Sequence, residues 1–396
     1  MRLVLGLGIL LFISLSLGGC SADESDSPSA AGTTSRSIAG TTVREAPSIA
    51  ELVAKLSLRQ KAAQVLMLGF PEDALSTPDS TLNQLLDGSP PGGVVLYGRN
   101  VGSPAQVRQL TEQLQQAARE TEAAALLVAV DQEGGPIRRI EEGVPAVPSA
   151  RTLGEEANPS SAGNLAGRQA RALLELGINT NLAPVADVVS DPASFLFERT
   201  YSADAGEVSE YVAAMVGAQE AAGLVSVVKH FPGHGAALGD THEGIARAGA
   251  SLEELRNIHL IPFSAAIAAG APAVMVAHIE VPALGEEETV SASRSPAVIQ
   301  GLLREELGFR GVVITDDLEM GAVGDAGQAA VQSLVAGADM LIVGHSPEVQ
   351  LEVLEAIETA VRGGRLATSR LDEAVGRVYQ LKRDYGLLAD QASPGN

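Results

Sequence analysis

Residues 126–135 read LLVAVDQEGG, an apolar run, Leu126–Val130, followed at once by Asp131, Gln132, Glu133 and a pair of glycines. A short apolar run bounded by turn residues is typical of a strand buried on both faces of a parallel sheet. Three other runs end in the same way: Val225–Val228 before Lys229-His230, Val274–Ala277 before His278, and Val312–Ile314 before Thr315-Asp316-Asp317. Barrels and open α/β sheets carry their chemistry at the carboxyl ends of strands, so the pattern predicts an α/β fold with its site at that edge.

Outward from this segment, short runs rich in Val, Ile and Leu alternate with helix signals along the chain. Helices are expected to begin near the serine N-caps Ser48, Ser57, Ser103, Ser251, Ser295, Ser346 and Ser369. Eight runs are candidate strands: Val65–Phe70, Gly93–Tyr97, Leu126–Val130, Thr180–Val185, Val225–Val228, Val274–Ala277, Val312–Ile314 and Met340–Val343. Their number and order favour one (β/α)8 TIM barrel, a single catalytic domain, over two small doubly wound domains.

The composition excludes several classes of protein. The chain has 396 residues, with 27 Lys and Arg against 49 Asp and Glu, and a formal net charge of −22. Such an acidic surface repels a phosphate backbone, so we expect no nucleic-acid partner. A single cysteine excludes an internal disulfide and makes a zinc or iron–sulfur site built on cysteines untenable. With 45% apolar residues, a packed core can hold the fold instead.

The amino-terminal residues predict export. Arg2 precedes the apolar run Leu3–Leu17, which is too short for an ordinary membrane-spanning helix. The sequence Leu-Gly-Gly-Cys ending at Cys20 resembles a bacterial lipobox, so residues 1–19 are expected to be a signal peptide and Cys20 the lipidated residue. Cleavage at another bond would instead leave a free thiol. Residues 20–48 have the composition of a flexible tether and residues 49–390 that of the barrel, which would be anchored to the outer face of the cell membrane.

The histidines concentrate in one segment. Residues 229–235 read KHFPGHG, and Asp240-Thr241-His242 follows shortly afterwards. A carboxylate two residues from an imidazole can orient the ring and raise its basicity, so Asp240 and His242 are candidates for general acid/base work. Two alternatives remain open for the segment. His230, His234 and His242 could bind a metal with an aspartate, or the histidines could merely hydrogen-bond the loop backbone.

The segment Thr315–Met320 supplies a second candidate group. Adjacent residues at the end of a strand point to opposite faces, so one of Asp316 and Asp317 can face the site while the other caps a helix or binds Arg or Lys. A carboxylate nucleophile together with a separate proton donor is the minimum equipment of a retaining glycosidase. The cations expected to clamp substrate hydroxyls, or to keep the carboxylate ionised, are Arg139, Arg199 and Lys229.

Seven motifs together are similar to those of glycoside hydrolase family 3, in its exo-acting β-N-acetylglucosaminidase (β-hexosaminidase) branch. They are VAVDQEGG (128–135), LAPVADV (182–188), ERTY (198–201), KHFPGHG (229–235), DTH (240–242), VAHI (276–279) and GVVITDDLEM (311–320). The resemblance implies a (β/α)8 barrel and a retaining mechanism. It implies that Asp316 is the catalytic aspartate, that His242 is the acid/base and that Asp240 is its dyad partner.

By the same matching, five residues line the subsite for the terminal sugar: Asp131, Arg139, Arg199, Lys229 and His230. This chain departs from the family pattern at Phe197, where the family has glycine two residues before the arginine. Many β-glucosidases of the family carry a second α/β domain that can contribute the acid/base. Residues 344–396 are too few for such a domain, so we expect the proton donor to come from the barrel.

The resemblance therefore implies an exo-glycosidase, for which we expect no cofactor or metal, and a tethered monomer is the simplest expectation for its oligomeric state. Its expected substrate is a carbohydrate with a non-reducing terminal β-linked N-acetylglucosamine, drawn from peptidoglycan fragments or related oligosaccharides. A β-glucosidase or an N-acetylglucosamine phosphorylase on the same barrel is an alternative. A metal-dependent amidohydrolase is another. A sugar-binding lipoprotein would also fit the export signal, although sugar-binding proteins use aromatic platforms and this chain has no Trp.

Overall fold

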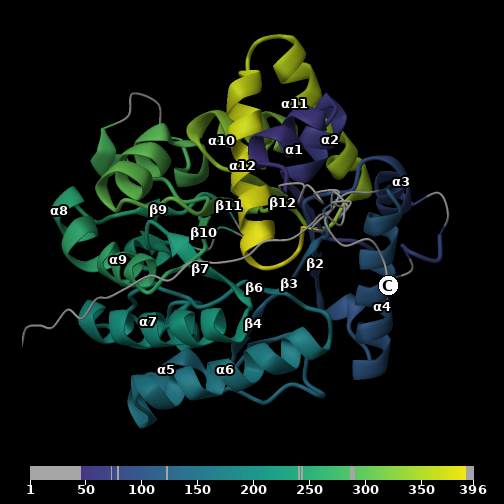
Figure 1. Ribbon diagram of the computed structural model, residues 1–396. Helices are drawn as coiled ribbons and strands as arrows, with labels where there is room; N and C mark the ends of the chain where they lie inside the picture. The colour runs from purple at the N-terminus through teal and green to yellow at the C-terminus, as the bar shows by residue number, and fades with distance from the viewer. Residues whose placement is uncertain are drawn as a thin grey trace, which may run out of the picture. The chain divides into compact units, whose positions relative to one another are not determined.

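The computed structural model describes residues 46–72, 74–77, 80–121, 124–239, 241, 244–285 and 290–388 (Figure 1). All of these lie in the second of two units into which the chain divides, Ala46–Asn396. The predicted signal peptide and Cys20 lie outside the described residues. Among the helices in the described ranges, none is long and apolar enough to cross a membrane.

Eight parallel strands close into a barrel, so the predicted fold class is confirmed. The order of neighbours around it is β1-β12-β11-β10-β7-β6-β3-β2. The strands are β1 (Leu66–Leu68), β2 (Gly93–Leu96), β3 (Leu127–Val130), β6 (Thr180–Asn181), β7 (Val225–Phe231), β10 (Ala273–Val276), β11 (Val312–Asp317) and β12 (Met340–Val343). Each of the predicted runs contains or overlaps one of them.

Strands β7 and β11 extend beyond their apolar runs. Strand β7 continues through Lys229 and His230, and Lys229 forms a parallel bridge with Val185. Strand β11 continues through Asp316 to Asp317, which pairs with Ile342 of β12. At these positions the backbone groups hydrogen-bond to neighbouring strands, so the strands include charged residues. A prediction based on hydrophobicity alone assigns such residues to loops.

Helices surround the strands in Figure 1 and fill the connections between them. The α-helices are α1 (Ile49–Lys55), α2 (Leu58–Gln64), α3 (Thr81–Gly88), α4 (Pro104–Glu120), α5 (Ala150–Glu156), α6 (Pro159–Glu175), α7 (Ala205–Ala222), α8 (Leu252–Glu254), α9 (Ile261–Ala268), α10 (Ala326–Ala336), α11 (Pro347–Arg362) and α12 (Thr368–Asp384). Short helical segments are η1 (Gly98–Asn100), η2 (Phe197–Arg199), η3 (His234–Ala236), η4 (Leu255–His259), η5 (Pro282–Leu284), η6 (Ala292–Arg294) and η7 (Ala297–Glu306). Two antiparallel ribbons, β4 (Gln132–Gly134) with β5 (Ile137–Arg138) and β8 (Ala237–Leu238) with β9 (Arg247–Ala248), lie outside the barrel sheet.

Most of the predicted helix starts hold. Capping boxes form at Ser48, Ser57 and Ser251, and Ser103 and Ser346 cap α4 and α11. One prediction is wrong. Helix α12 begins at Thr368 with Ala367 as its N-cap, so Ser369 lies inside the helix. A helical segment also begins near Ser295, whose hydroxyl accepts a hydrogen bond from the backbone N–H of Val298 just before η7.

The barrel interior is filled by alternate side chains of the strands. Met67, Val95, Met275, Ile314 and Ile342 belong to this inner cluster, and each is at most 3% exposed. Their strand neighbours point outward and pack against the helices. Burying one such side chain contributes about 1.5–3 kcal/mol, so the packed interior stabilises the fold and leaves the chemistry to the strand ends.

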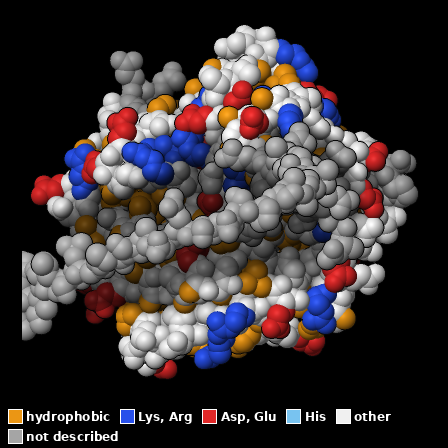
Figure 2. All heavy atoms as spheres, viewed as in Figure 1, with side chains coloured by type: hydrophobic (Ala, Val, Ile, Leu, Met, Phe, Trp, Pro, Cys, Tyr) orange, Lys and Arg blue, Asp and Glu red, His pale blue; other side chains and the backbone are white. Residues whose placement is uncertain are grey.

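Helix α12 closes the amino ends of the strands (yellow in Figure 1). Val378 and Leu381 pack into the inner cluster. The Lys382 ammonium group, fully buried, donates to Oε1 of Gln64, the residue at the end of α2 before β1. On the face shown in Figure 2, acidic and basic side chains lie among one another over the surrounding helices.

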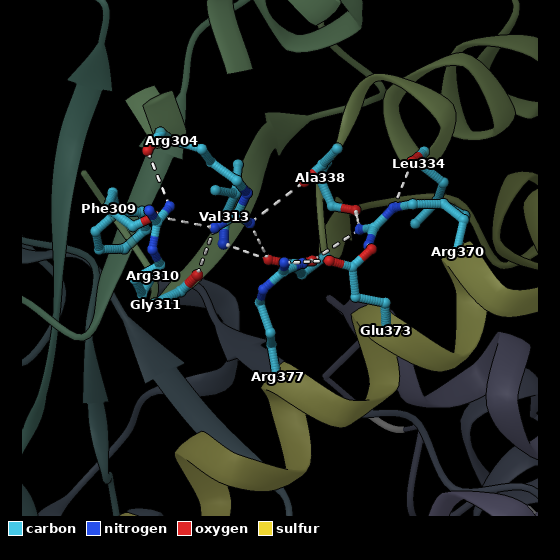
Figure 3. A network of polar contacts seen from close by, with 12 residues as sticks. Arg304, Phe309, Arg310, Gly311, Val313, Leu334, Ala338, Arg370, Glu373 and Arg377 are labelled. Carbon is cyan, nitrogen blue, oxygen red and sulfur yellow. Dashed lines mark hydrogen bonds and ion pairs between the residues drawn. The ribbon is translucent and has the colours of Figure 1, made fainter. Parts of the chain in front are cut away.

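A buried carboxylate joins α12 to the barrel at the same end. Asp339, which precedes β12 and is fully buried, accepts hydrogen bonds from Arg304, Arg370 and Arg377 at 2.6, 2.7 and 2.9 Å (Figure 3). It also accepts one from the backbone N–H of Val313 in β11, at 3.0 Å. The carboxylate therefore links β11, β12, η7 and α12 through one buried anion.

We expect Asp339→Asn to lower the free energy of unfolding by about 3–5 kcal/mol, because three arginines would lose the buried anion that compensates their charge. Urea unfolding at pH 7 measures the change. Glu373→Gln is the matched control, since Glu373 pairs with two of the same arginines but its side chain is 52% exposed. Equal losses in the two variants would contradict the role given to Asp339.

Lys382 makes stability depend on pH. Burial lowers the pKa of Lys382 to about 7, whereas the pKa of a lysine in the unfolded chain is about 10.4. Between these values the unfolded chain binds more protons, so stability rises with pH from about 7 to about 10, at up to about 1.4 kcal/mol per unit, and the full penalty persists below 7. We expect Lys382→Met to flatten this rise. Unfolding measured from pH 6 to 10 tests it, with the exposed Lys55→Met as control; parallel curves for all three proteins would refute it.

Candidate active site

A cavity of about 300 Å³ opens at the carboxyl ends of the barrel strands. It brings together the predicted site residues that the structure describes, which are Asp131, Arg139, Arg199, Lys229, His230 and Asp316. Asp240 and His242 lie outside the described residues, but Thr241 between them lines the cavity. Residues far apart in the sequence therefore meet at the edge of the barrel where the motifs predicted a site.

Asp316 presents a carboxylate to this cavity, and no Lys, Arg or His of the described residues forms an ion pair with it. It is half-buried near the end of β11, and its Oδ1 accepts a hydrogen bond from the backbone N–H of Asp317 at 2.9 Å. Burial alone would raise the pKa of Asp316, but the imidazoles of His230 and His278 and the Asp317 N–H outweigh burial and hold the pKa below its ordinary value. The side chain is therefore ionised at neutral pH, as a carboxylate nucleophile must be.

The adjacent Asp317 is held by other groups. Its Oδ1 accepts from the backbone N–H groups of Glu319 and Gly344, each at 3.1 Å. Its Oδ2 lies 3.3 Å from both the Tyr97 hydroxyl and Nε2 of His345. The expected helix cap or Arg or Lys partner is thus replaced by groups from the ends of β2 and β12. Asp317 fixes the strand end on which Asp316 stands.

A buried network of charges forms one wall of the cavity. Nζ of Lys229 lies 2.7 Å from Oδ1 of Asp131 and 2.7 Å from Oε1 of Glu133. Arg199 donates to both oxygens of Glu133, each at 2.8 Å. Burial opposes ionisation of Glu133, but the charges of Lys229 and Arg199 lower its pKa to about 2. Burial likewise disfavours the charged Lys229, yet Asp131 and Glu133 raise its pKa, so Glu133, Lys229 and Arg199 stay charged at neutral pH.

Arg139 reaches the same wall from the β4–β5 ribbon. Its Nη2 lies 3.9 Å from Oδ2 of Asp131, and its side chain is 35% exposed. The ribbon is braced by the buried Gln132, whose amide donates to the carbonyl of Ile140 and accepts from the backbone N–H groups of Arg139 and Ile140. Arg139 is the least buried of the cations, so it has the most freedom to contact a ligand.

Arg199 keeps its place despite the Phe197 departure from the family pattern. Both residues belong to η2, and the guanidinium of Arg151 lies 4.1 Å from the centre of the Phe197 ring. Arg151 also donates to the Phe197 carbonyl and to the Thr200 hydroxyl. The larger side chain is therefore packed against Arg151, and Arg199 still lines the cavity.

His230 is oriented by a buried carboxylate. Its Nδ1 lies 2.7 Å from Oδ2 of Asp187, which also accepts from the His230 backbone N–H at 3.3 Å. Burial would raise the pKa of Asp187, but His230 lowers it below its ordinary value. An ionised carboxylate can only accept hydrogen bonds, so Nδ1 of His230 carries the proton that it donates to Asp187. The other ring nitrogen, Nε2, lies 3.4 Å from Nη2 of Arg199.

Two of the three histidines of the metal alternative have protein partners, and the third, His242, lies outside the described residues. Nδ1 of His230 is bound to Asp187, and Nε2 of His234 lies 3.1 Å from the Thr241 hydroxyl. Within the described ranges, no group of three or more His, Cys, Asp or Glu side chains is placed to hold a metal ion.

Sequence reasoning missed several groups of the site. Glu133 and Asp187 stand inside the quoted motifs but were given no role. Tyr97 directly follows β2, and His345 lies two residues after the end of β12. Nε2 of His278 lies 3.1 Å from the carbonyl oxygen of Asp317. A search for polar residues at the last position of each predicted strand and at the two positions after it could have found Tyr97 and His345.

Comparison with known proteins identifies the family. Residues 57–381 match the N-terminal domain of glycosyl hydrolase family 3. A β-hexosaminidase of Stenotrophomonas maltophilia (strain K279a) is 39% identical over 307 residues, covering 75% of this chain and 87% of that protein.

Solved structures agree. The family 3 β-N-acetylglucosaminidase of Paenibacillus superposes with a TM-score of 0.81 at 38% identity over 86% of this chain, which spans 65% of that protein. The β-N-acetylhexosaminidase of Beutenbergia cavernae superposes with a TM-score of 0.76 at 29% identity over 83% of this chain and 99% of that one. With a barrel, a strand-end cavity and a match over most of its length, the chain belongs to glycoside hydrolase family 3.

Proposed function

We propose that the protein is a retaining exo-glycosidase that removes β-linked N-acetylglucosamine from the non-reducing end of its substrate. The observation that carries the proposal is the ionised carboxylate of Asp316, which has no ion-pair partner among the described residues and faces a cavity lined by hydrogen-bonding groups. Relatives named as β-hexosaminidase and β-N-acetylglucosaminidase support the choice of sugar.

The reaction uses two displacements. Asp316 attacks the anomeric carbon and forms a glycosyl ester, while the bond to the leaving oxygen breaks and His242 gives that oxygen a proton. His242 then takes a proton from water, which displaces Asp316 and releases the sugar. Asp240 would orient the imidazole for both steps. The sequence resemblance supports the roles of Asp240 and His242, and Thr241, which lies between them in the sequence, lines the cavity.

The charged wall suits the hydroxyls of one terminal sugar. Asp131 and Glu133 can accept from hydroxyls, while Lys229, Arg199 and Arg139 can donate to them. Their mutual ion pairs hold them in place before the sugar arrives, which reduces the entropy lost on binding. A cavity of about 300 Å³ lies at the small end of ligand sites and favours a single sugar over an extended chain.

Water is favoured over phosphate as the acceptor. Lys229 and Arg199 are already paired with Asp131 and Glu133, so a phosphate dianion would meet cations whose charge is largely neutralised. The nearby Asp316 and Asp187 add further negative charge. Arg139, 3.9 Å from Asp131, is less closely paired, but one such cation would have to outweigh the charges of Asp316 and Asp187 to hold a phosphate dianion.

We expect Asp316→Asn to lower kcat on an aryl β-N-acetylglucosaminide by at least about 10³-fold while leaving sugar binding nearly unchanged, since the amide keeps the shape but cannot form the ester. Steady-state kinetics and calorimetric titration with N-acetylglucosamine measure the two effects. Asp317→Asn is the matched control, because Asp317 is bound to β12 and Tyr97 and should lose far less activity. Near wild-type turnover by Asp316→Asn would refute the proposal.

The same assay separates the alternative activities. Turnover that persists in a chelator argues against the metal-dependent amidohydrolase, and turnover that phosphate does not accelerate argues against the phosphorylase. A phosphorolytic product in phosphate buffer would replace the proposed hydrolysis.

We propose further that the protein acts outside the cell on peptidoglycan fragments, held to the membrane by a lipid on Cys20. The charged residue, apolar run and lipobox-like end of residues 1–20 support this location. The expected result of Cys20→Ala is transfer of the protein from the membrane fraction to the soluble fraction with its activity intact. Fractionation of cells expressing the full chain tests it, and an unchanged distribution would rule out the anchor.

A further inference from the structure

Thr241 is joined to both sides of the active site. It is 1% exposed, and its hydroxyl lies 3.1 Å from Nε2 of His234. Its carbonyl accepts a hydrogen bond from the backbone N–H of Ala322 at 3.2 Å. In the sequence, Thr241 is flanked by Asp240 and His242, the dyad of the proposed mechanism.

His234 belongs to the rigid frame of the sugar subsite. It is 2% exposed, and its ring packs edge-on against His230, with ring centres 5.9 Å apart. The turn that carries it is tied to the site by Asp187, whose Oδ1 accepts from the Gly235 backbone N–H at 3.3 Å. The same carboxylate orients His230, so one buried aspartate positions both histidines.

Ala322 connects Thr241 to the nucleophile. It follows β11 in the segment that leaves Asp316, and Met320 and Gly321 of that segment line the cavity. Thr241 is therefore held by its side chain to the frame of His230 and by its backbone to the segment after Asp316. Asp240 and His242 are the neighbours of this doubly held residue in the sequence.

We propose that His234 and Thr241 are positioning residues that place the acid/base for proton transfer to the leaving oxygen. The inference rests on the proposed function, in which His242 is that acid/base. A group that must deliver a proton within hydrogen-bond reach is sensitive to displacement, and a misplacement of about 1 Å can cost about 10²-fold in rate.

The hydrogen bond is suited to operate at neutral pH. Burial, followed by the charge of His230, lowers the pKa of His234, so its ring is neutral there. A neutral imidazole and a hydroxyl can pair whichever ring nitrogen bears the proton, because the hydroxyl can donate or accept. Both partners are buried, so water does not compete for the bond.

Leaving groups of different basicity distinguish this role from a general structural one. Phenolate is a basic leaving group, so cleavage of a phenyl glycoside needs a proton on the leaving oxygen. The weakly basic 2,4-dinitrophenolate leaves without a proton. We expect Thr241→Val to lower kcat/KM about 10–100-fold on phenyl β-N-acetylglucosaminide but less than about 3-fold on the dinitrophenyl compound. Thr241→Ser keeps the hydroxyl and should restore the phenyl rate. His234→Leu should reproduce the Thr241→Val pattern, and the double variant should be no worse than either single one.

Two outcomes of these assays would contradict the positioning role. Equal losses on both glycosides would mean a structural role, and no loss on either would mean that the bond is idle; each overturns the inference and leaves the proposed function standing. His242→Ala is the reference, expected to show the strongest dependence on the leaving group. If it shows none, the acid/base assignment fails and the inference fails with it.

Discussion

The active site depends on the buried ammonium group of Lys229. At 2% exposure, an isolated ammonium would cost several kcal/mol to remove from water, so this position is tenable only because Asp131 and Glu133 each approach it to 2.7 Å. Arg199 completes the set through its two bonds to Glu133. The three ion pairs join β3, the ribbon after it, η2 and β7, and they give this wall of the cavity a fixed shape.

The adjacent aspartates of β11 perform different tasks because of which way each points. The oxygens of Asp317 contact two backbone N–H groups, the Tyr97 hydroxyl and His345, and these contacts fix the end of β11 to the ends of β12 and β2. Asp316 accepts from the Asp317 N–H and otherwise faces the cavity. The alternation of a β-strand separates the two side chains, so one carboxylate fixes the strand end while the other faces the cavity as an ionised group.

The barrel and the location of its site could be predicted from the sequence because both follow from local patterns. Apolar runs mark the strands, and a charged residue after Val130 or Ile314 marks the edge that carries chemistry. Partner choice could not be predicted, because it depends on which strands become neighbours. Nothing near Glu133 in the sequence indicates that it accepts from Lys229 and Arg199, and nothing near Asp187 indicates that it orients His230. The prediction that a helix begins at Ser369 was also wrong, because α12 begins one residue earlier, at Thr368. A serine caps a helix only where the backbone before it is not yet helical.

Two buried lysines at opposite ends of the barrel show why residue type alone does not determine behaviour. Lys229 has two carboxylates as partners and stays charged, with its pKa raised despite burial. Lys382 has the side-chain oxygen of Gln64, an uncharged partner, and burial lowers its pKa to about 7. The first lysine is placed where a charge can serve a polar ligand, and the second lies beneath α12, where Asp339 and the inner cluster hold the fold. The barrel thus keeps the groups that stabilise it at the amino ends of its strands, so the carboxyl ends can hold an uncommitted carboxylate without endangering the fold.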